Sequence, residues 1–308
     1  MTVATSRVAA APVKPGRLQR RNRYVGVLFV APYLLFLLFF GIAPAVYAVG
    51  LAFTSQTAWT FEGVGNFERV VRDFRFLPAA GHVALYLLVW LVALVVLVVV
   101  LAVMVHGIGR RWISGTVRML YYIPGALAGA SSVLLWLFML NPVASPVGPL
   151  LRSMGYTSFN STIQPSHLPI VFAIIAFWTG AGGWIIVMYG ALNNIPTEVL
   201  EAARIDGADA IQIAWRIEIP MLRRWISYMA VLSLAAGTQL FVEPTLLSQA
   251  SNAVVPNDYS LNQLAYQYAF NLGDFNGAAA ISVLLLVVAL ALSALFVQRG
   301  GLFDTEDQ

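Results

Sequence analysis

One polar segment, residues 191–224, has residue types and spacing that suit recognition of another protein rather than covalent chemistry. It begins with a short predicted helix in which Thr197 is the expected N-cap and Glu198 and Glu201 lie in the first turn, where carboxylates interact favourably with the helix dipole. Asp206-Gly207 then interrupts this helix, because Gly207 supplies the positive φ that a helix C-cap or tight turn requires. The pattern predicts a short helix followed by a sharp turn.

A second short helix is expected from about Asp209 to Arg216, ending before Pro220. The two helices carry more apolar side chains than they can bury against each other, namely Val199, Leu200, Ala202, Ala203, Ile205, Ile211, Ile213 and Trp215. An apolar patch with a charged rim indicates either a partner protein or contact with the lipid interface. Of the two, the partner is favoured.

Other chemically reactive groups are scarce in this sequence. There is no cysteine, which excludes disulfides, thiolate nucleophiles and Cys-ligated metal centres. The three histidines, His82, His106 and His167, are far apart and are expected to be interfacial polar residues rather than metal ligands. No Gly-x-x-x-x-Gly-Lys-Ser/Thr loop is present, so an ATP site of that kind must belong to another chain.

The elements that position this segment must be membrane helices. Of 308 residues, 59% are hydrophobic and 10% charged, against about 25% charged in a soluble domain. Long neutral runs predict spans at 25–50, 82–105, 119–140, 168–190, 226–249 and 278–297. The predicted fold is all-α and integral to the membrane, with six transmembrane helices and outer loops at 51–81, 141–167 and 250–277 that are partly ordered.

The distribution of basic residues predicts the orientation. The apolar run after the basic tail is too long for a cleaved signal, so the first span is expected to be retained. With the tail inside, 14 of the 18 Lys and Arg lie in cytoplasmic segments. We therefore expect a basic cytoplasmic tail at 1–23, a six-helix domain at 24–298 and a cytoplasmic tail at 299–308, so that both termini are inside.

Residues 201–208, EAARIDGA, followed by Ile217-Glu218-Ile219-Pro220, resemble the EAA loop of permease subunits of binding-protein-dependent ABC importers. The family pattern is Glu-Ala-Ala, a glycine three residues on, about nine residues, and Ile-x-Leu-Pro. The spacing is matched throughout, with Ile219 in place of leucine.

Weaker motifs extend the resemblance from about residue 24 onward. Arg118 to Pro124 with Trp136 is similar to a third-helix pattern of carbohydrate permeases, and residues 239–244, QLFVEP, resemble their fifth-helix motif. Residues 266–270 and 275–280 resemble the approach to the last helix. Together these motifs point to the sugar branch related to the maltose and glycerol-3-phosphate permeases. The chain departs from the family at Ala214, at Arg224 and at residues 249–252, and the last of these departures leaves outer-loop roles open.

The resemblance implies a type I ABC importer permease fold in the inner membrane of a bacterial or archaeal cell, and a multi-pass transport subunit rather than an enzyme. The expected partners are a second homologous permease in a heterodimer, two ATPase subunits that bind ATP and Mg²⁺, an extracytoplasmic solute-binding protein, a carbohydrate and the lipid bilayer. No nucleic acid, metal or cofactor is implied for this chain itself. The residues assigned to ATPase coupling are Glu201, Ala202, Ala203, Asp206, Gly207, Ala208, Ile217 and Pro220.

Candidates for the substrate pathway are an ionisable residue, an amide and aromatic rings, which suit sugar hydroxyls and C–H faces. Glu243 and Gln239, four residues apart, are expected on one face of the fifth span. Trp136, Trp178 and Tyr189 could supply rings, although packing and interfacial roles are the commoner use of such residues. Glycines at 125, 129, 180, 182 and 183 are expected to permit close helix packing rather than to form a hinge.

Two other classes of membrane protein fit this sequence less well. An intramembrane serine protease needs a histidine near a serine such as Ser131 or Ser132, and no histidine lies inside a span. A channel or secondary transporter would use buried charges, and only Glu243 fits that description. Neither class explains residues 191–224.

Overall fold

The computed structural model describes residues 17–56, 60–108, 110–127, 129–252 and 254–300. Within these ranges every regular element is a helix, and the one β-type contact is an isolated antiparallel bridge between Thr54 and Phe61. Residues 1–16 of the expected N-terminal tail and 301–308 of the expected C-terminal tail lie outside the described residues. The chain divides into two units, residues 1–50 and 51–308.

The first unit is one long apolar helix with a π-helical turn. The elements are α1 (Arg17–Leu37), η1 (Leu38–Ile42) and α2 (Ala43–Ala52). They form a candidate span at Val27–Ala52 with a mean hydropathy of 2.3, close to the predicted 25–50. Its 26 residues suffice to cross a bilayer.

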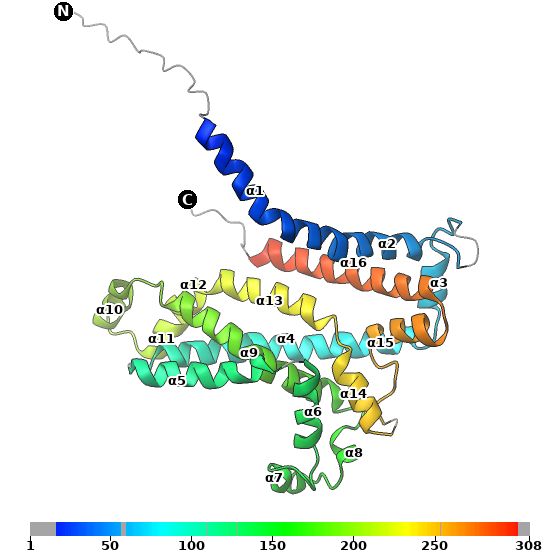
Figure 1. Ribbon diagram of the computed structural model, residues 1–308. Coiled ribbons are helices and arrows are strands. Elements are labelled where there is room, and N and C mark those ends of the chain that lie inside the picture. The colour runs from blue at the N-terminus through cyan, green and yellow to red at the C-terminus, as the bar shows by residue number, and fades with distance from the viewer. Residues whose placement is uncertain (1–16, 57–59, 109, 128, 253, 301–308) are drawn as a thin grey trace, which may run out of the picture. The chain divides into compact units, whose positions relative to one another are not determined.

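The second unit contains the remaining helices (Figure 1). These are α3 (Gly65–Val71), α4 (Phe76–His106), α5 (Arg111–Tyr122), η2 (Ile123–Ala126), α6 (Gly129–Met139), α7 (Gly148–Ser153), α8 (Phe159–Thr162), α9 (Leu168–Leu192), α10 (Thr197–Ile205), α11 (Ala210–Ile213), η3 (Ala214–Glu218), α12 (Ile219–Met221), α13 (Arg223–Gly237), α14 (Val242–Ala250), α15 (Leu261–Tyr266), η4 (Gln267–Asn271) and α16 (Phe275–Gly300). The predicted partial order of residues 51–81, 141–167 and 250–277 is confirmed by α3, α7, α8 and α15.

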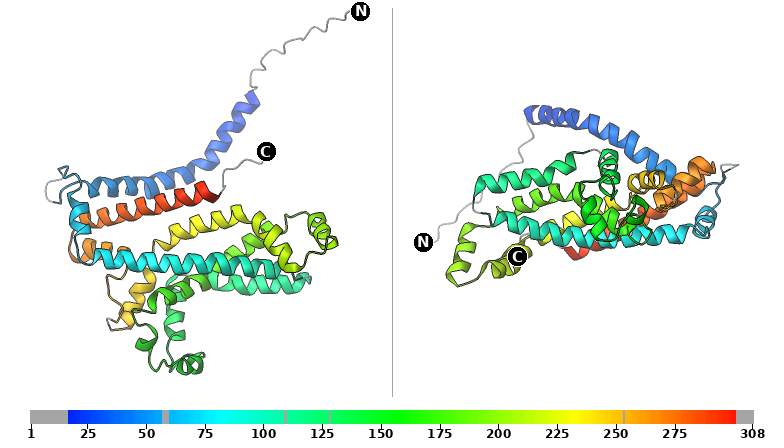
Figure 2. Two further views of the ribbon diagram at one scale, coloured as in Figure 1. Left: turned by 180° about the vertical axis from the view of Figure 1, so that it is seen from behind. Right: turned by 90° about the horizontal axis from the view of Figure 1, so that it is seen from below.

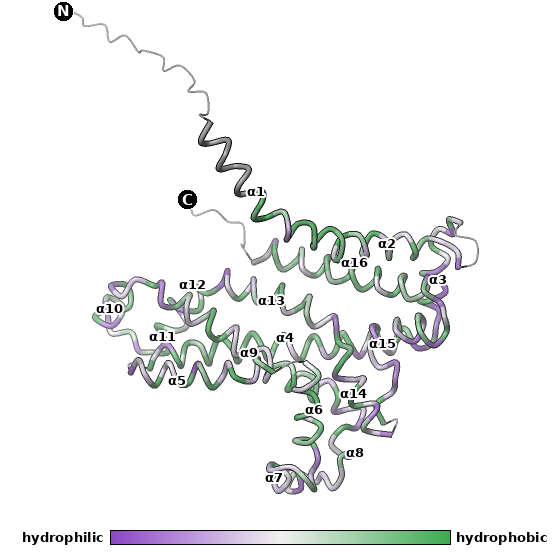
Figure 3. Tube along the Cα trace, in the orientation of Figure 1, coloured by the Kyte–Doolittle hydropathy of each residue, from purple (hydrophilic) through white to green (hydrophobic). Residues whose placement is uncertain are grey.

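The centre of this unit is the pair α4 and α9, which lie side by side. Both are apolar along nearly their whole length, as Figure 3 shows for α4. Leu94 and Val98 of α4 and Phe172, Ile185 and Met188 of α9 are completely buried in the same core. These helices match the predicted second and fourth spans, and α16 matches the sixth.

The predicted third span, 119–140, is wrong as a single helix. The chain is helical from Arg111, changes to a 3₁₀ turn at Ile123–Ala126, and continues as α6 after a bend of more than 40°. Pro124 lies in that turn, where its missing N–H and fixed φ interrupt an α-helix. Gly182 of α9 lies directly against the backbone of Tyr121 and Tyr122, so α9 packs against the helix where it ends.

The predicted fifth span, 226–249, is likewise broken, into α13 and α14 with a bend of 44°. The break at residues 238–241 is stabilised by polar contacts that replace helical ones. The Thr238 hydroxyl donates to the Ala235 carbonyl at 2.8 Å, and the Asn262 amide donates to the Thr238 carbonyl at 2.8 Å. Pro244 then lies in the first turn of α14, where a missing N–H is tolerated. The described part of the chain thus contains four candidate spans, or up to six if each bent pair counts as one.

Helices α3 and α15 lie at the opposite end of the unit from α10 (Figures 1 and 2). An ion-pair cluster there joins α3 and the segment before α4 to η4 and the residue before α16. Asp73 accepts hydrogen bonds from Arg75 at 2.7 Å and from the Tyr268 hydroxyl at 2.6 Å. Arg69 and Asp274 form a second ion pair at 2.9 Å. The hydrogen bonds from Arg75, together with that from Tyr268, hold the pKa of Asp73 well below its usual range, while burial and the bond to Asp73 raise the pKa of Tyr268 to about 12.

We expect the Asp73 cluster to be insensitive to pH across the physiological range. A carboxylate with a depressed pKa contributes stability that is fully present above its unfolded pKa of about 3.9 and is lost only as the pH falls through the folded pKa. Asp73→Asn should therefore lower stability by about 2 kcal/mol equally at pH 5 and pH 8. Thermal unfolding of the purified chain in mild detergent measures this, with the exposed Glu62→Gln as control. A penalty that disappears between pH 8 and pH 5 would contradict it.

Candidate functional site

The segment between α9 and α13, called here the coupling loop (residues 191–224), contains the turn predicted at Gly207. Gly207 has a φ of 84° and follows the last residue of α10 by two positions. Its N–H bonds to the Arg204 carbonyl at 3.1 Å, and the Ala208 N–H bonds to the Ala203 carbonyl at 2.9 Å. These two bonds form a Schellman motif, which caps the orphan carbonyls of α10 and sets the exit direction of the chain.

The start of α10 differs from the prediction. Pro196, not Thr197, occupies the N-cap position, and Thr197 is the first helical residue. The extended backbone at Pro196, with φ −56° and ψ 131°, ends the preceding turn, and no side chain caps the helix there.

The second helix of the loop begins as predicted but does not stop before Pro220. Asp209 and Gln212 form a capping box, with the Gln212 N–H donating to the Asp209 carboxylate at 2.7 Å. The chain then remains helical through the π-helical η3 and through α12. Pro220 is accommodated because it follows the wide turn of η3, in which the Ile219 N–H bonds to the Ala214 carbonyl.

The apolar residues of the loop divide into two groups. Leu200 and Ile213 are buried, 8% and 7% exposed. Ile205, Ile211 and Trp215 are 86%, 70% and 68% exposed. Among the predicted coupling residues, the structure exposes Glu201, Ala202, Asp206, Gly207 and Pro220 and half-buries Ala203, Ala208 and Ile217. The loop therefore presents an apolar surface around a hydrogen-bonded turn, which is suited to docking another protein.

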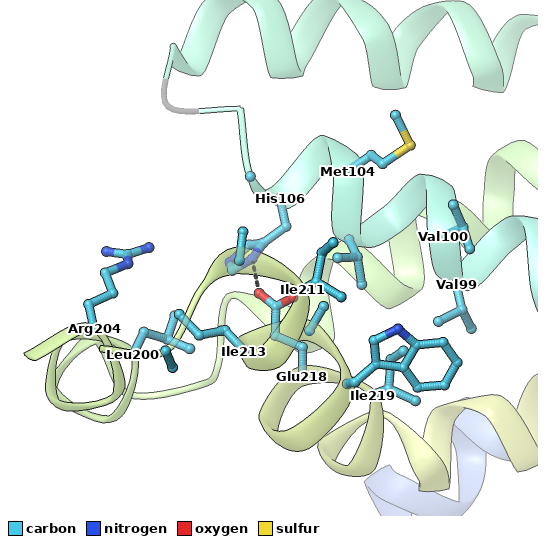
Figure 4. A pocket seen from close by; sticks show the side chains of 16 residues that line it. Val99, Val100, Met104, His106, Leu200, Arg204, Ile211, Ile213, Glu218 and Ile219 are labelled. Carbon is cyan, nitrogen blue, oxygen red and sulfur yellow. Dashed lines mark hydrogen bonds and ion pairs between the residues drawn. The ribbon is translucent and has the colours of Figure 1, made fainter. Parts of the chain in front are cut away.

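A cleft of about 620 Å³ lies between the end of α4 and the coupling loop, and the exposed Ile211 and Trp215 are among the residues that line it (Figure 4). At its base the His106 Nδ1 lies 2.9 Å from a Glu218 carboxylate oxygen. Neither residue was predicted as functional. The available signal was Glu218 itself, a carboxylate between Ile217 and Ile219, both of which are partly buried against the core.

The predicted substrate-pathway residues do not form one site. Trp136 of α6 and Trp178 of α9 are in edge-to-face contact, with ring centroids 5.8 Å apart. Tyr189 lies 11 residues along α9 from Trp178, about 16 Å away along the helix. Tyr189 lies near the C-terminal end of α9, beside the start of the coupling loop, and the guanidinium of Arg118 on α5 covers its ring at 3.9 Å.

Gln239 and Glu243 do not share a helix face, contrary to the prediction. Gln239 is an exposed residue of the break between α13 and α14, whereas Glu243 lies half-buried in the first turn of α14. Their spacing of four residues therefore does not follow helical geometry.

Comparison with known proteins agrees with this architecture. Residues 94–300 match the family model described as binding-protein-dependent transport system inner membrane component. The chain is 29% identical over 293 residues to the multiple sugar-binding transport system permease protein MsmF of Streptococcus mutans, covering 92% of this chain and 97% of MsmF. It is 26% identical over 278 residues to the sn-glycerol-3-phosphate transport system permease protein UgpA of Escherichia coli, covering 89% and 92%.

A solved structure has the same fold. It is a crystal structure of a bacterial ABC transporter involved in the import of the acidic polysaccharide alginate, which matches with a TM-score of 0.78 and 20% identity, covering 94% of this chain and 100% of that one. A crystal structure of a bacterial alginate ABC transporter in complex with an alginate pentasaccharide-bound periplasmic protein also matches, with a TM-score of 0.78 and 20% identity. The predicted permease fold is thereby confirmed. Because the family model matches about two thirds of its sequence, this chain belongs to the family of binding-protein-dependent transport system inner membrane components.

Proposed function

We propose that the chain is the permease subunit of an ATP-driven sugar importer and forms half of a translocation pathway. The observation that carries the proposal is the coupling loop, in which the Gly207 turn positions an exposed apolar surface at Ile205, Ile211 and Trp215. Relatives named for sugar and glycerol-3-phosphate transport support a carbohydrate or sugar-like substrate.

The proposed assembly contains a second homologous permease, two ATPase subunits and an extracytoplasmic solute-binding protein. ATP and Mg²⁺ are bound by the ATPase, which docks on the coupling loop. Closure of the two ATPases moves the loops, and rocking of the two permeases then exposes a central site to each side of the membrane in turn. In this chain Trp136, Trp178, Gln239 and Glu243 remain the proposed contacts to substrate, while Tyr189 belongs with the coupling loop by its position.

The ATPase contact is tested by Ile205→Asp. A carboxylate in place of a side chain that is 86% exposed in the free chain should leave folding intact but be buried without a partner in the complex. We expect the variant to recover at least tenfold less ATPase than the wild type when the tagged chain is purified in mild detergent and its partners are identified by mass spectrometry.

Val143→Asp is the matched control, because Val143 is 77% exposed in the segment between α6 and α7. It should recover the ATPase normally. If the wild-type chain is purified without any ATPase, the importer assignment fails.

The proposed orientation places both termini and the coupling loop in the cytoplasm, with residues 1–23 and 299–308 as cytoplasmic tails on either side of the 24–298 permease domain. The absence of cysteine makes this directly measurable, because a single introduced cysteine is the only thiol. Asn160→Cys, in α8, should react with a membrane-impermeant maleimide in intact cells. Asn194→Cys, between α9 and α10, should react only after permeabilisation, and the reverse pattern would invert the topology.

A further inference from the structure

The His106–Glu218 pair is a direct polar side-chain contact between α4 and the coupling loop (Figure 4). Glu218 is 7% exposed, and the His106 side chain is 17% exposed. An isolated buried carboxylate is costly, so the imidazole that faces it supplies the donor it needs. Glu218 is also the last residue of the π-helical η3, an irregular turn of a kind that is frequent at functional sites.

His106 is joined in turn to α9. The rings of His106 and Tyr189 meet edge to face, with centroids 6.0 Å apart and an interplanar angle of 71°. Tyr189 lies near the end of α9, three residues before Leu192, which is the last residue of that helix. The loop is therefore connected to α9 twice, once through the backbone and once through the side chains of Glu218, His106 and Tyr189.

The same group reaches α5. Arg118 lies over the Tyr189 ring at 3.9 Å, and its Nε donates to the Ser114 carbonyl at 3.1 Å. Ser114 is itself buried, and its hydroxyl donates to the Val105 carbonyl at the end of α4 at 3.4 Å. We call His106, Ser114, Arg118, Tyr189 and Glu218 the coupling junction. It draws α4, α5, α9 and the coupling loop together at one end of the helix bundle.

The Schellman turn and the coupling junction involve two different parts of the coupling loop. Gly207 orients the exposed part of the loop, while Glu218 attaches its other part to the long helices eleven residues later. The cleft of about 620 Å³ between the loop and α4 leaves the exposed face of the loop only partly packed on that helix. Leu200 and Ile213 supply non-directional apolar contact there, whereas the His106–Glu218 bond is directional.

We propose that His106 and Glu218 are positioning residues through which displacement of the coupling loop moves α4, α5 and α9 as one body. This inference rests on the proposed coupling function, since it concerns how movement of the ATPase reaches the transmembrane helices. It requires no contact between either residue and the ATPase or the substrate.

The test uses the complete importer purified with its own ATPase and reconstituted in proteoliposomes. His106→Phe keeps the ring against Tyr189 but removes the donor, and Glu218→Ala removes the acceptor. In both variants we expect substrate uptake per ATP hydrolysed to fall by about fivefold or more, in the range of typical coupling effects between sites. His106→Asn, whose amide nitrogen takes the place of Nδ1, and Glu218→Gln, which keeps an acceptor oxygen, should stay within about twofold of the wild type.

The ratio of uptake to hydrolysis separates positioning from mere stability. A purely structural role would lower the yield of complex but leave this ratio unchanged once it is normalised to assembled transporter. Wild-type ratios for both His106→Phe and Glu218→Ala, or equal losses in the conservative and disruptive variants, would overturn the proposal. Failure of the proposed function itself is distinct, because no ATPase would then be purified with the wild-type chain.

Discussion

Replacing Gly207 with valine is expected to abolish coupling to the ATPase. Gly207 has a φ of 84°, a conformation that a β-branched residue adopts only at a cost of about 1–3 kcal/mol. An added Cβ would meet no atom within 4 Å, so the whole effect comes from backbone conformation rather than from a clash. The chain should relieve the strain by giving up the Ala208–Ala203 bond, which turns α10 away from its docking orientation.

The measurement is recovery of the ATPase with the purified chain, followed by uptake after reconstitution. We expect Gly207→Val to lose most of both, while Gly207→Asn retains more because asparagine tolerates positive φ. Gly155→Val is the matched control, since Gly155 has a φ of 93° and equally open surroundings in the segment between α7 and α8. Normal uptake by Gly207→Val, or equal loss of ATPase in Gly155→Val, would remove the turn from the mechanism.

Replacing Gly182 with alanine is expected to lower the stability of the chain markedly. A Cβ at this position would lie 2.6 Å from the Tyr121 carbonyl carbon and 2.9 Å from the Tyr122 Cα, and closer still to the Tyr121 carbonyl oxygen. These are backbone atoms of the end of α5, which cannot move without displacing the helix. Overpacking of this kind costs about 3 kcal/mol, more than the gain of about 1 kcal/mol that alanine normally brings to a helix.

Gly183→Ala provides the internal comparison. The neighbouring glycine has no atom within 4 Å of an added Cβ, so alanine there should be neutral or slightly stabilising in the isolated chain. Thermal unfolding and the yield of monodisperse protein in detergent distinguish the two variants. Equal behaviour of Gly182→Ala and Gly183→Ala would show that α5 and α9 do not approach each other this closely.

The glycines of the third and fourth spans fall into two structural groups. The glycines of the third and fourth spans were expected to permit close helix packing, and Gly182 and Gly125 do lie against backbone atoms of the opposite element. Gly129, Gly180 and Gly183 face open space. Composition cannot separate the two groups, because the difference depends on which face of α9 meets α5.

The sequence by itself determined the properties that are local. Hydropathy fixes the apolar segments, because a bilayer selects for length and absence of charge. The spacing from Glu201 to Pro220 predicts the coupling role of this loop, and Gly207 is predicted to lie in a left-handed turn because glycine adopts positive φ without strain.

Tertiary structure alone decided the features that depend on distant residues. The break after Gly237 is stable because Asn262, 24 residues beyond Thr238, supplies a donor to its carbonyl. His106 has a buried polar partner because the carboxylate of Glu218, 112 residues away in sequence, lies 2.9 Å from its Nδ1. Such pairings are invisible to periodicity, since a buried polar group is stable only if a partner from another element meets it.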